Sequence, residues 1–493
     1  MFPFKTSIQF DRKSSQALYL QLANQMIQLI KNQTLASETK LPSSRLLAEQ
    51  LHVHRKTIVA CYEELILQGW VESIPRRGTF VRRNLPLLQQ KKLDNFKEGY
   101  GITNAGFPYY SNPILPEKGS KKKNGFLSTN DGVSDSRLTP IDEISRIYRR
   151  ICSRKTIFNH LSYGTTYGND RLREVLVDYL NTTRGLQSTK ANVLITRGSQ
   201  MGIWLSSQLL LNKEDVIVVG NTNYESADLS FLQQQAKLER ISVDEDGLVT
   251  DELERLCLQH QIKAVYVTSH HHHPTTVTLS AKRRIHLLNL SKTYNFAIIE
   301  DDYDYDFHYN HAPILPLASH DTNGNVIYIG SVCKTVAPVY RIGYLIAPKE
   351  FVDEAAKLRG FVDRQGDALL ELTFAQFISS GDLDRHIRKV IKTYKQRRDL
   401  FCKLLKDELG NFFQFGIPKG GMAVWVKLSS KYSWARVAEV AEKYQLDIRN
   451  WQCYDRAQLG HNAIRMGFGR YNNEEIHEFI YRLKKTMSHI ERQ

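Results

Sequence analysis

Polar side chains with complementary chemistry follow apolar, strand-like stretches in the second half of the chain. Lys334 comes shortly after NVIYIG (325–330), and Asp301 and Tyr303 come directly after FAIIE (296–300). Carbanion chemistry on amines uses a lysine imine with an electron-poor ring, a carboxylate that keeps the ring nitrogen protonated, and donors to the ring oxygen. Because open α/β sheets bind ligands at strand ends, we expect these side chains to share one site.

A phosphate cradle for the same site is predicted from two further segments. The stretch NVLITRGSQ (192–200) predicts a strand that runs into a helix start, where backbone N–H groups bind anions. A hydroxyl and a fixed cation flank Lys334 and suit the same ligand. The phosphate-site candidates are Gly198, Ser199, Gln200, Ser331 and Arg341. Tyr224, after VIVVG (216–220), either stacks on a ring or packs in the core.

Two patterns suit a metal ion instead. Carboxylates alternate in DDYDYD (301–306), but a calcium loop that begins at Asp302 requires glycine where Phe307 stands and glutamate where Pro313 stands. Four consecutive histidines occupy 270–273, yet successive side chains of extended backbone point to opposite faces. We therefore predict no metal site.

The first 85 residues indicate a different chemistry. Apolar residues at helical spacing predict a helix over 17–31, and the segment 40–70 predicts two short helices around a turn at 52–54. The stretch WVESIPRRGTFVRR (70–83) predicts a hairpin with arginines at its tip. The candidate DNA contacts are Arg45, Arg55, Lys56, Thr57, Arg76 and Arg77. A solvated face explains any one of these cations, but the order helix, helix-turn-helix and basic wing argues for DNA.

Positive charge is concentrated in the same part of the chain. Of 493 residues with net charge +15, residues 1–90 hold 12 Lys and Arg against 6 Asp and Glu, and residues 91–125 hold 7 against 3. Such a field favours a polyanionic partner. Without an apolar leader or a run of about 18 apolar residues, we expect no membrane contact and a cytoplasmic location. Six cysteines without a C-x-x-C pair suit reduced thiols.

The hydrophobic pattern predicts an α/β protein of several domains. We expect a DNA-binding domain at 1–85, a basic linker at 86–125 and a larger domain at 126–490. Its smaller α+β part, from about 366 to 490, is expected around one strand at 422–428. Strands that alternate with helical stretches predict a mainly parallel sheet covered by helices. They are expected at 192–196, 216–220, 264–268, 296–300, 325–330 and 344–347.

Residues 41–65 resemble the winged helix-turn-helix domain of the GntR regulators. The family pattern runs roughly L-P-S-S-R-x-L-A-x-x-L-G-V-x-R-x-T-V-x-x-A-Y-x-x-L, and the match extends almost throughout. His52 stands where the family usually has the turn glycine. A residue with a Cβ must therefore adopt a strained or altered turn at this position.

The strand-end groups resemble the fold-type I pyridoxal-phosphate enzymes of the aspartate aminotransferase-like fold, over about 126–490. A GntR domain followed by this fold is similar to the MocR-type regulators. The resemblance implies that Lys334 forms the internal aldimine with pyridoxal 5′-phosphate and that Asp301 pairs with the ring nitrogen. It also implies that Tyr303 binds the ring hydroxyl, that Tyr224 stacks, and that Arg465, in AIRMGFG (463–469), clamps a substrate or effector carboxylate.

One loop departs from these relatives. Where they carry a His-Gln-aromatic-Pro-Ser/Thr-Gly-like sequence, this chain reads HHHPTT over 271–276 and lacks the glycine. The departure suggests a different ligand preference.

Three functions follow from these patterns. The first is a transcriptional regulator, a head-to-tail homodimer in the family's manner, in which an amine, an amino acid or pyridoxal phosphate itself shifts promoter binding. The second is an aminotransferase with an accessory DNA-binding domain. The third is a nucleic-acid scaffold with an empty enzyme fold, against which Lys334 and Asp301 argue. A metabolic enzyme needs no promoter-reading domain, so we favour the first.

Overall fold

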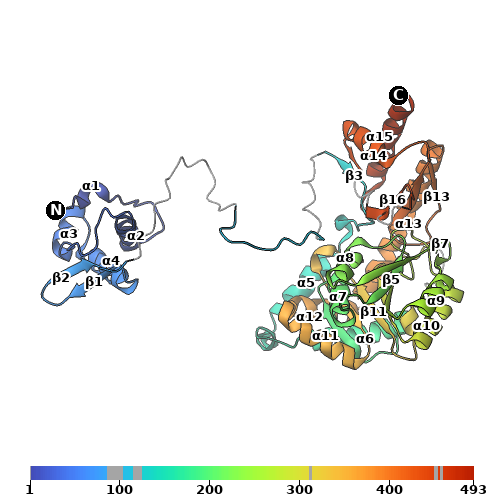
Figure 1. Cartoon of the computed structure of the whole chain (residues 1–493), viewed down its shortest axis with the longest axis horizontal. Helices are drawn as coiled ribbons and strands as arrows, with labels where there is room; N and C mark the ends of the chain where they lie inside the picture. Colours follow the sequence, from blue (N-terminus) through green and yellow to red (C-terminus); the bar gives the residue numbers. More distant parts are fainter. Residues whose placement is uncertain are drawn as a thin grey trace. The chain divides into compact units, whose positions relative to one another are not determined.

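The chain forms two compact units, Met1–Tyr110 and Ser111–Gln493 (Figure 1). A computed structural model describes residues 2–85, 104–114, 125–309, 314–332, 334–448, 453–455 and 459–493. Of the predicted linker at 86–125, residues 86–103 and 115–124 lie outside the described residues. The exact domain limits therefore stay a prediction. Within the described residues, no helix is both long and apolar enough to cross a membrane.

The N-terminal unit is a winged helix-turn-helix. Its elements are α1 (Phe4–Ser7), α2 (Leu18–Lys31), α3 (Ser44–Leu51), α4 (Arg55–Leu67), β1 (Val71–Ile74) and β2 (Gly78–Val81). Leu22, Met26 and Ile30 recur on one face of α2 and pack into a core with α3 and α4. β1 and β2 pair antiparallel from Val71↔Val81 to Ile74↔Gly78. The predicted helix, helix-turn-helix and wing are all present.

A seven-stranded sheet forms the centre of the C-terminal unit. Its order is β4-β12-β11-β10-β9-β5-β6, and only β12 runs antiparallel to its neighbours. The strands are β4 (Val193–Thr196), β5 (Val216–Gly220), β6 (Lys237–Ile241), β9 (Ile262–Val267), β10 (Ala297–Asp302), β11 (Val326–Ser331) and β12 (Gly343–Ile346). The mainly parallel sheet predicted from the sequence is confirmed. β6 was not predicted, because it lies at the edge of the sheet and its sequence, KLERI, has three charged residues and no apolar run.

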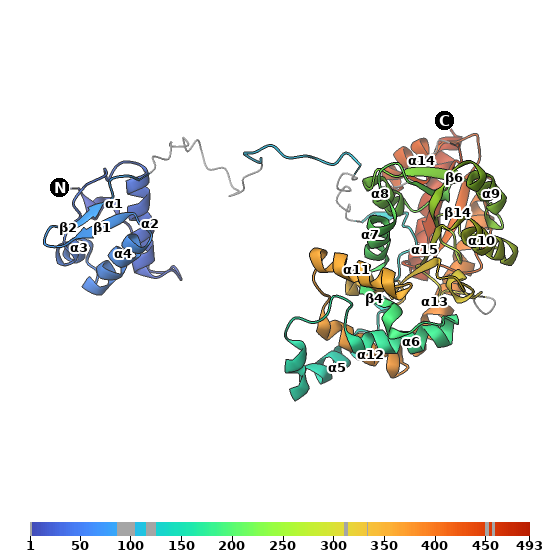
Figure 2. The same cartoon turned by 60° about the horizontal axis from the view of Figure 1, so that its bottom comes forward.

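Helices cover both faces of this sheet. Alternate strand residues enter different cores: Ile299 packs with α7 (Ser199–Leu210), α8 (Glu225–Gln233) and α11 (Lys349–Val362). Ile298 packs with α9 (Thr250–Gln259) and α10 (Ala281–Tyr294) on the other side. Figure 2 shows the two helix layers on either side of the sheet. This double covering explains why the central strands read as continuous apolar runs.

Two further helical groups complete the unit. Near β4, α5 (Ile141–Cys152), α6 (Asp170–Arg184) and α12 (Ala368–Ser379) pack together. The smaller part has a three-stranded antiparallel sheet, β13 (Phe413–Phe415), β14 (Ala423–Leu428) and β16 (Ala463–Gly467), covered by α13 (Asp382–Leu409), α14 (Trp434–Ala441) and α15 (Asn473–Glu491). Sequence patterning predicted only β14 there. Its two partner strands are short and were read as part of the surrounding helical region.

Candidate functional site

A cavity of about 140 Å³ lies at the strand ends of the large sheet, and Lys334, Asp301, Tyr303, Ser199 and Tyr224 all line it. The structure thus brings together five of the residues that the sequence assigned to one site. A larger surface cavity of about 690 Å³ lies between α13 and α15 and contains none of these groups.

Lys334 lies in the turn that follows β11. Its Nζ is 4.2 Å from the centroid of the Tyr303 ring. Burial lowers the pKa of Lys334, partly offset by the carboxylates of Asp131, Asp304 and Asp301. A lowered pKa raises the fraction of unprotonated amine, which is the form that condenses with a carbonyl.

Asp301, near the end of β10, has a free carboxylate oxygen. Its Oδ2 accepts a hydrogen bond of 2.8 Å from the hydroxyl of Tyr266, whereas its buried Oδ1 has no partner. Burial raises the pKa of Asp301 to about 7. An unsatisfied buried carboxylate oxygen beside the cavity suits a ligand that brings its own N–H donor.

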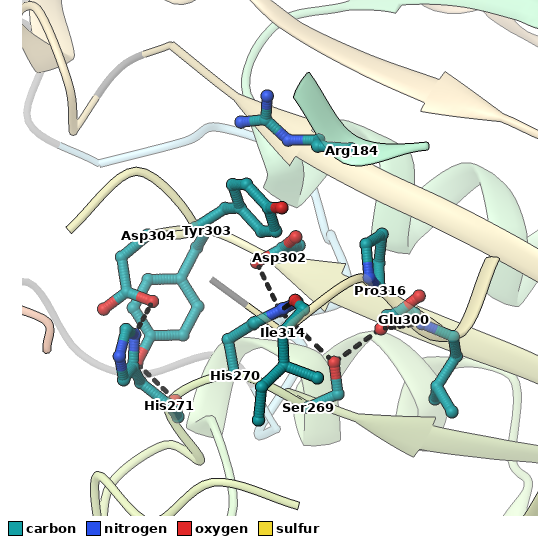
Figure 3. Close-up of polar contacts among 12 residues, drawn as sticks. Arg184, Ser269, His270, His271, Glu300, Asp302, Tyr303, Asp304, Ile314 and Pro316 are labelled. Carbon is teal, nitrogen blue, oxygen red and sulfur yellow. Dashed lines mark hydrogen bonds and ion pairs between the residues drawn. The ribbon is translucent and has the colours of Figure 1, made fainter. Parts of the chain in front are cut away.

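The next residue, Asp302, is held in a different way. It lies 3.2 Å from Nδ1 of His270 and accepts a hydrogen bond of 2.6 Å from the hydroxyl of Tyr328. Burial favours the neutral acid, but His270 and Arg184 outweigh it and lower the pKa of Asp302 to about 2. Figure 3 shows His270 beside Asp302 and His271 beside Asp304. Of the two carboxylates, only Asp301 lines the cavity.

Tyr303 lines the cavity, but its hydroxyl has protein partners. It donates to the main-chain oxygen of His271 over 2.8 Å and accepts from Nη2 of Arg465 over 3.3 Å. Its O–H could donate to a cofactor hydroxyl only by leaving His271 O, whereas its oxygen can still accept a hydrogen bond. The predicted contact with the cofactor hydroxyl stays a prediction.

The predicted phosphate cradle divides into two groups. Gly198 precedes α7 with φ 77° and ψ 173°, a conformation that favours glycine, and a Cβ there would lie 3.0 Å from the guanidinium of Arg341. Arg341 also donates to the main-chain oxygen of Arg197 over 2.6 Å. Gly198, Ser199 and Arg341 thus meet at the start of α7.

The other two phosphate candidates are bonded elsewhere. The side-chain amide of Gln200 donates to Ser226 O and Ser230 Oγ, at 3.2 Å and 3.0 Å. The hydroxyl of Ser331 donates to Ile342 O over 3.1 Å. Of the phosphate-site candidates only Ser199 lines the cavity, and the phosphate role of all five stays a prediction.

Sequence analysis missed a cluster of charged residues at the same cavity. Asp131 and His273 line it, and Oδ2 of Asp131 is 2.8 Å from Nε2 of His273. Arg465, the predicted carboxylate clamp, is buried on β16 with its Nε 3.4 Å from Oδ1 of Asp131. Burial alone would raise the pKa of Asp131, but these two residues lower it. No sequence pattern marks Asp131, because it follows the predicted linker in a polar loop.

Tyr224 and His273 form one wall of the cavity. Their rings meet edge to face, with centroids 5.2 Å apart and an angle of 70°. Tyr224 is thus placed beside the ligand space, and stacking on a bound ring stays a prediction.

The four histidines lie in a bend and turn and have separate partners, and Nδ1 of His272 is 3.0 Å from Oγ1 of Thr275. His270 contacts Asp302, and Nδ1 of His271 is 2.8 Å from Oδ1 of Asp304 (Figure 3). His273 contacts Asp131. In the described part of the chain, no group of three or more His, Cys, Asp or Glu is arranged to hold a metal ion. Thr276 has φ 66°, so a residue with a Cβ occupies the left-handed position where relatives are expected to have glycine.

The predicted DNA contacts gather on the winged helix. Arg55 and Lys56 are exposed at the start of α4, which His54 caps by accepting from the Lys56 N–H over 3.2 Å. The Nε of Arg55 donates to Ser44 Oγ over 3.2 Å, which fixes α3 against the start of α4. Arg45 is exposed in the first turn of α3.

The turn and the wing complete this surface. Arg76 and Arg77 are exposed in the turn between β1 and β2, and Thr57 is half-buried. His52 adopts φ 50° and ψ 46°, so the left-handed turn persists without the usual glycine. Exposed cations at the start of one helix and at a wing tip can bind DNA bases and phosphates.

Comparison with known proteins supports both halves of this description. Residues 127–483 match the family model "Aminotransferase class I and II", and residues 18–81 match "Bacterial regulatory proteins, gntR family". The chain is 27% identical to the uncharacterized HTH-type transcriptional regulator YdfD of Bacillus subtilis, covering 94% of this chain and 95% of YdfD. It is 25% identical to the probable rhizopine catabolism regulatory protein MocR of Rhizobium meliloti, covering 84% and 82%.

A solved structure shows the same fold in the larger unit. Kynurenine aminotransferase of Pyrococcus horikoshii, in complex with PMP, aligns with a TM-score of 0.70 and 27% identity, over 74% of this chain and 91% of that one.

Proposed function

We propose that this chain, which belongs to the aminotransferase class I and II family and carries a gntR-type DNA-binding domain, is a pyridoxal-phosphate-dependent transcriptional regulator of MocR type. The observation that carries the proposal is the presence of both modules in one chain. The regulatory protein MocR matches over 84% of this chain, which is more of the chain than either module covers alone. Promoter binding requires access to the chromosome, so a cytoplasmic location is part of the proposal.

The residues at the cavity suit pyridoxal 5′-phosphate, the cofactor of the family. Asp301 offers an unpartnered buried oxygen to a ring N–H, and Lys334 offers a half-buried amine. Beside them, Ser199 lines the cavity at the start of α7, where Arg341 lies against Gly198. When bound, the cofactor supplies an electron-poor ring and an aldehyde carbon that accepts an amine.

Each residue has a separate task in this proposal. Lys334 holds the cofactor through its ε-amino group, and its lowered pKa favours the reactive neutral form. Asp301 keeps a proton on the ring nitrogen, because an ionised carboxylate in a buried site stabilises a neighbouring cation. Arg341 and the N–H groups at the start of α7 orient the phosphate.

DNA recognition is assigned to the winged helix. Arg55 and Lys56 would contact bases and phosphates from the start of α4, and Arg76 and Arg77 would contact a groove or backbone from the wing. We propose a homodimer, so that two winged helices bind half-sites spaced by about 34 Å or a multiple of it.

Regulation requires that the effector bind two conformations with different affinity. A ligand of equal affinity for both would leave promoter binding unchanged, however tightly it bound. We propose that an amine, an amino acid or the cofactor itself is this ligand. Each has the chemistry to occupy the site that Lys334 and Asp301 line.

Aminotransferase turnover is the second candidate function. The likeness to a kynurenine aminotransferase and the presence of Lys334, Asp301 and Arg465 favour it. Steady turnover on the order of 1 per second or faster would place the protein with metabolic enzymes. A regulator requires no such rate.

The test is a titration of the cofactor-loaded full chain with a panel of amines and amino acids. Cofactor absorbance and binding to DNA from upstream of the chain's own gene are followed in the same samples. The proposal expects the two signals to change together, and borohydride to fix the cofactor on the wild type but not on Lys334→Ala. Ligand binding with unchanged DNA affinity across the panel would contradict it.

A further inference from the structure

The predicted carboxylate clamp already holds a carboxylate of this chain. Oδ1 of Asp131 lies 3.4 Å from Nε of Arg465, and the main-chain oxygen of Asp131 accepts from the same nitrogen over 3.4 Å. Arg465 is 1% exposed. Its charge is therefore balanced inside the protein by a residue that also lines the ligand cavity.

Asp131 is held by more than this ion pair. Its Oδ1 accepts from the Tyr454 hydroxyl over 3.0 Å, and its Oδ2 is 2.8 Å from Nε2 of His273. Three partners from three separate segments fix the carboxylate in place. Displacing it would leave a buried imidazole and a phenol without their acceptor, which is unfavourable.

The remaining donors of Arg465 are also engaged. Nη1 donates to Pro274 O over 3.0 Å, and Nη2 donates to the Tyr303 hydroxyl over 3.3 Å. Each guanidinium nitrogen thus has a protein partner. A ligand carboxylate would have to compete for these donors and would stand beside the anion of Asp131.

We propose that Asp131 is a specificity-determining residue, which makes the site select primary amines without an α-carboxylate over the corresponding α-amino acids. The inference rests on the proposed function, because the ligand amine must reach the cofactor that Lys334 holds. An amino acid adds a second anion next to Asp131, and two like charges in a buried site repel strongly. A decarboxylated amine avoids this repulsion and leaves the Arg465–Asp131 pair intact. The selection concerns recognition and involves no bond-forming step.

The experiment compares ligands that differ only in the carboxylate. Dissociation constants for phenylalanine and phenethylamine, and for lysine and cadaverine, are measured by calorimetry on the cofactor-loaded full chain. Asp131→Asn keeps the shape and one acceptor oxygen but removes the charge. Asp178→Asn removes the charge of an exposed acid on α6 that does not line the cavity, and serves as the matched control.

In the wild type, each amine should bind at least about tenfold more tightly than its amino acid, and Asp131→Asn should reduce this ratio about tenfold. Asp178→Asn should leave the ratio unchanged. A wild type that binds the amino acids as tightly as the amines overturns the inference, whether or not the variant folds. An unchanged ratio in a folded, loaded Asp131→Asn also overturns it.

DNA binding, measured on the same samples, distinguishes a failure of the Asp131 inference from a failure of the proposed function. If the loaded protein binds DNA and responds to ligands without the expected preference, only the role of Asp131 fails. If the full chain neither takes up cofactor nor binds DNA, the proposed function fails, and the assignment of Asp131 fails with it.

Discussion

Replacing Asp301 by asparagine should affect the cofactor-free fold and cofactor binding in opposite directions. Burial raises the pKa of Asp301 from 3.8 to about 7, so its ionisation opposes folding while the cofactor is absent. Because the folded-state pKa is the higher one, the folded chain binds more protons between the two values, and stability falls as pH rises through this window. Asparagine cannot ionise, and its oxygen can still accept from Tyr266.

The magnitude follows from the two pKa values. At 1.36 kcal/mol per pH unit, the advantage of Asp301→Asn in free energy of unfolding should grow by at most about 3 kcal/mol between about pH 4.5 and about pH 8. In the loaded protein the variant loses a charge-assisted hydrogen bond of about 1.5 to 3 kcal/mol, so cofactor affinity should fall about 10- to 100-fold.

Denaturant unfolding of cofactor-free wild type and variant, at both pH values, measures the first effect. Cofactor titration followed by absorbance measures the second. A cofactor-free variant that is less stable than the wild type at about pH 8 would refute the argument from burial. An unchanged cofactor dissociation constant would remove Asp301 from the ring nitrogen.

Three further changes test other parts of the structure. Gly198→Ala places a Cβ 3.0 Å from the Arg341 guanidinium, at a backbone conformation that favours glycine, so cofactor affinity should fall about tenfold or more in an absorbance titration. Gly416→Ala, where a Cβ meets open space, is the control and should leave cofactor affinity unchanged. Arg55→Ala should weaken promoter binding by about 1 to 3 kcal/mol and relax base preference in gel shifts. Unaltered gel shifts would exclude Arg55 from the residues that contact DNA bases. His52→Gly should raise the unfolding free energy of the winged helix by up to about 1 kcal/mol, because φ is 50° there; a lower melting temperature would contradict this.

Sequence patterning located the site because strand ends are local features. The run NVIYIG became β11, and FAIIE became β10, so Lys334 and Asp301 were placed at one sheet edge before any tertiary contact was known. The parallel arrangement then follows from the alternation of strands and helices.

Sequence patterning could not supply the contacts between distant segments. Asp131 and Arg465 are 334 positions apart, and only folding brings them together. Gln200 and Ser331 have the right residue types for a phosphate, but Ser226, Ser230 and Ile342 determine where their side chains point. Side-chain direction depends on such tertiary partners, which the residue type alone does not reveal.

The antiparallel strand β12 has a consequence for the order of events during synthesis. Arg341 lies just before β12, which pairs with β4, and it bonds to Arg197 from 144 positions later in the chain. A nascent chain that has emerged only as far as β11 therefore lacks the cation that meets Gly198. On the proposed role of Arg341, tight cofactor binding waits until the segment through β12 has been synthesised, when residues 347–493 are still to be made.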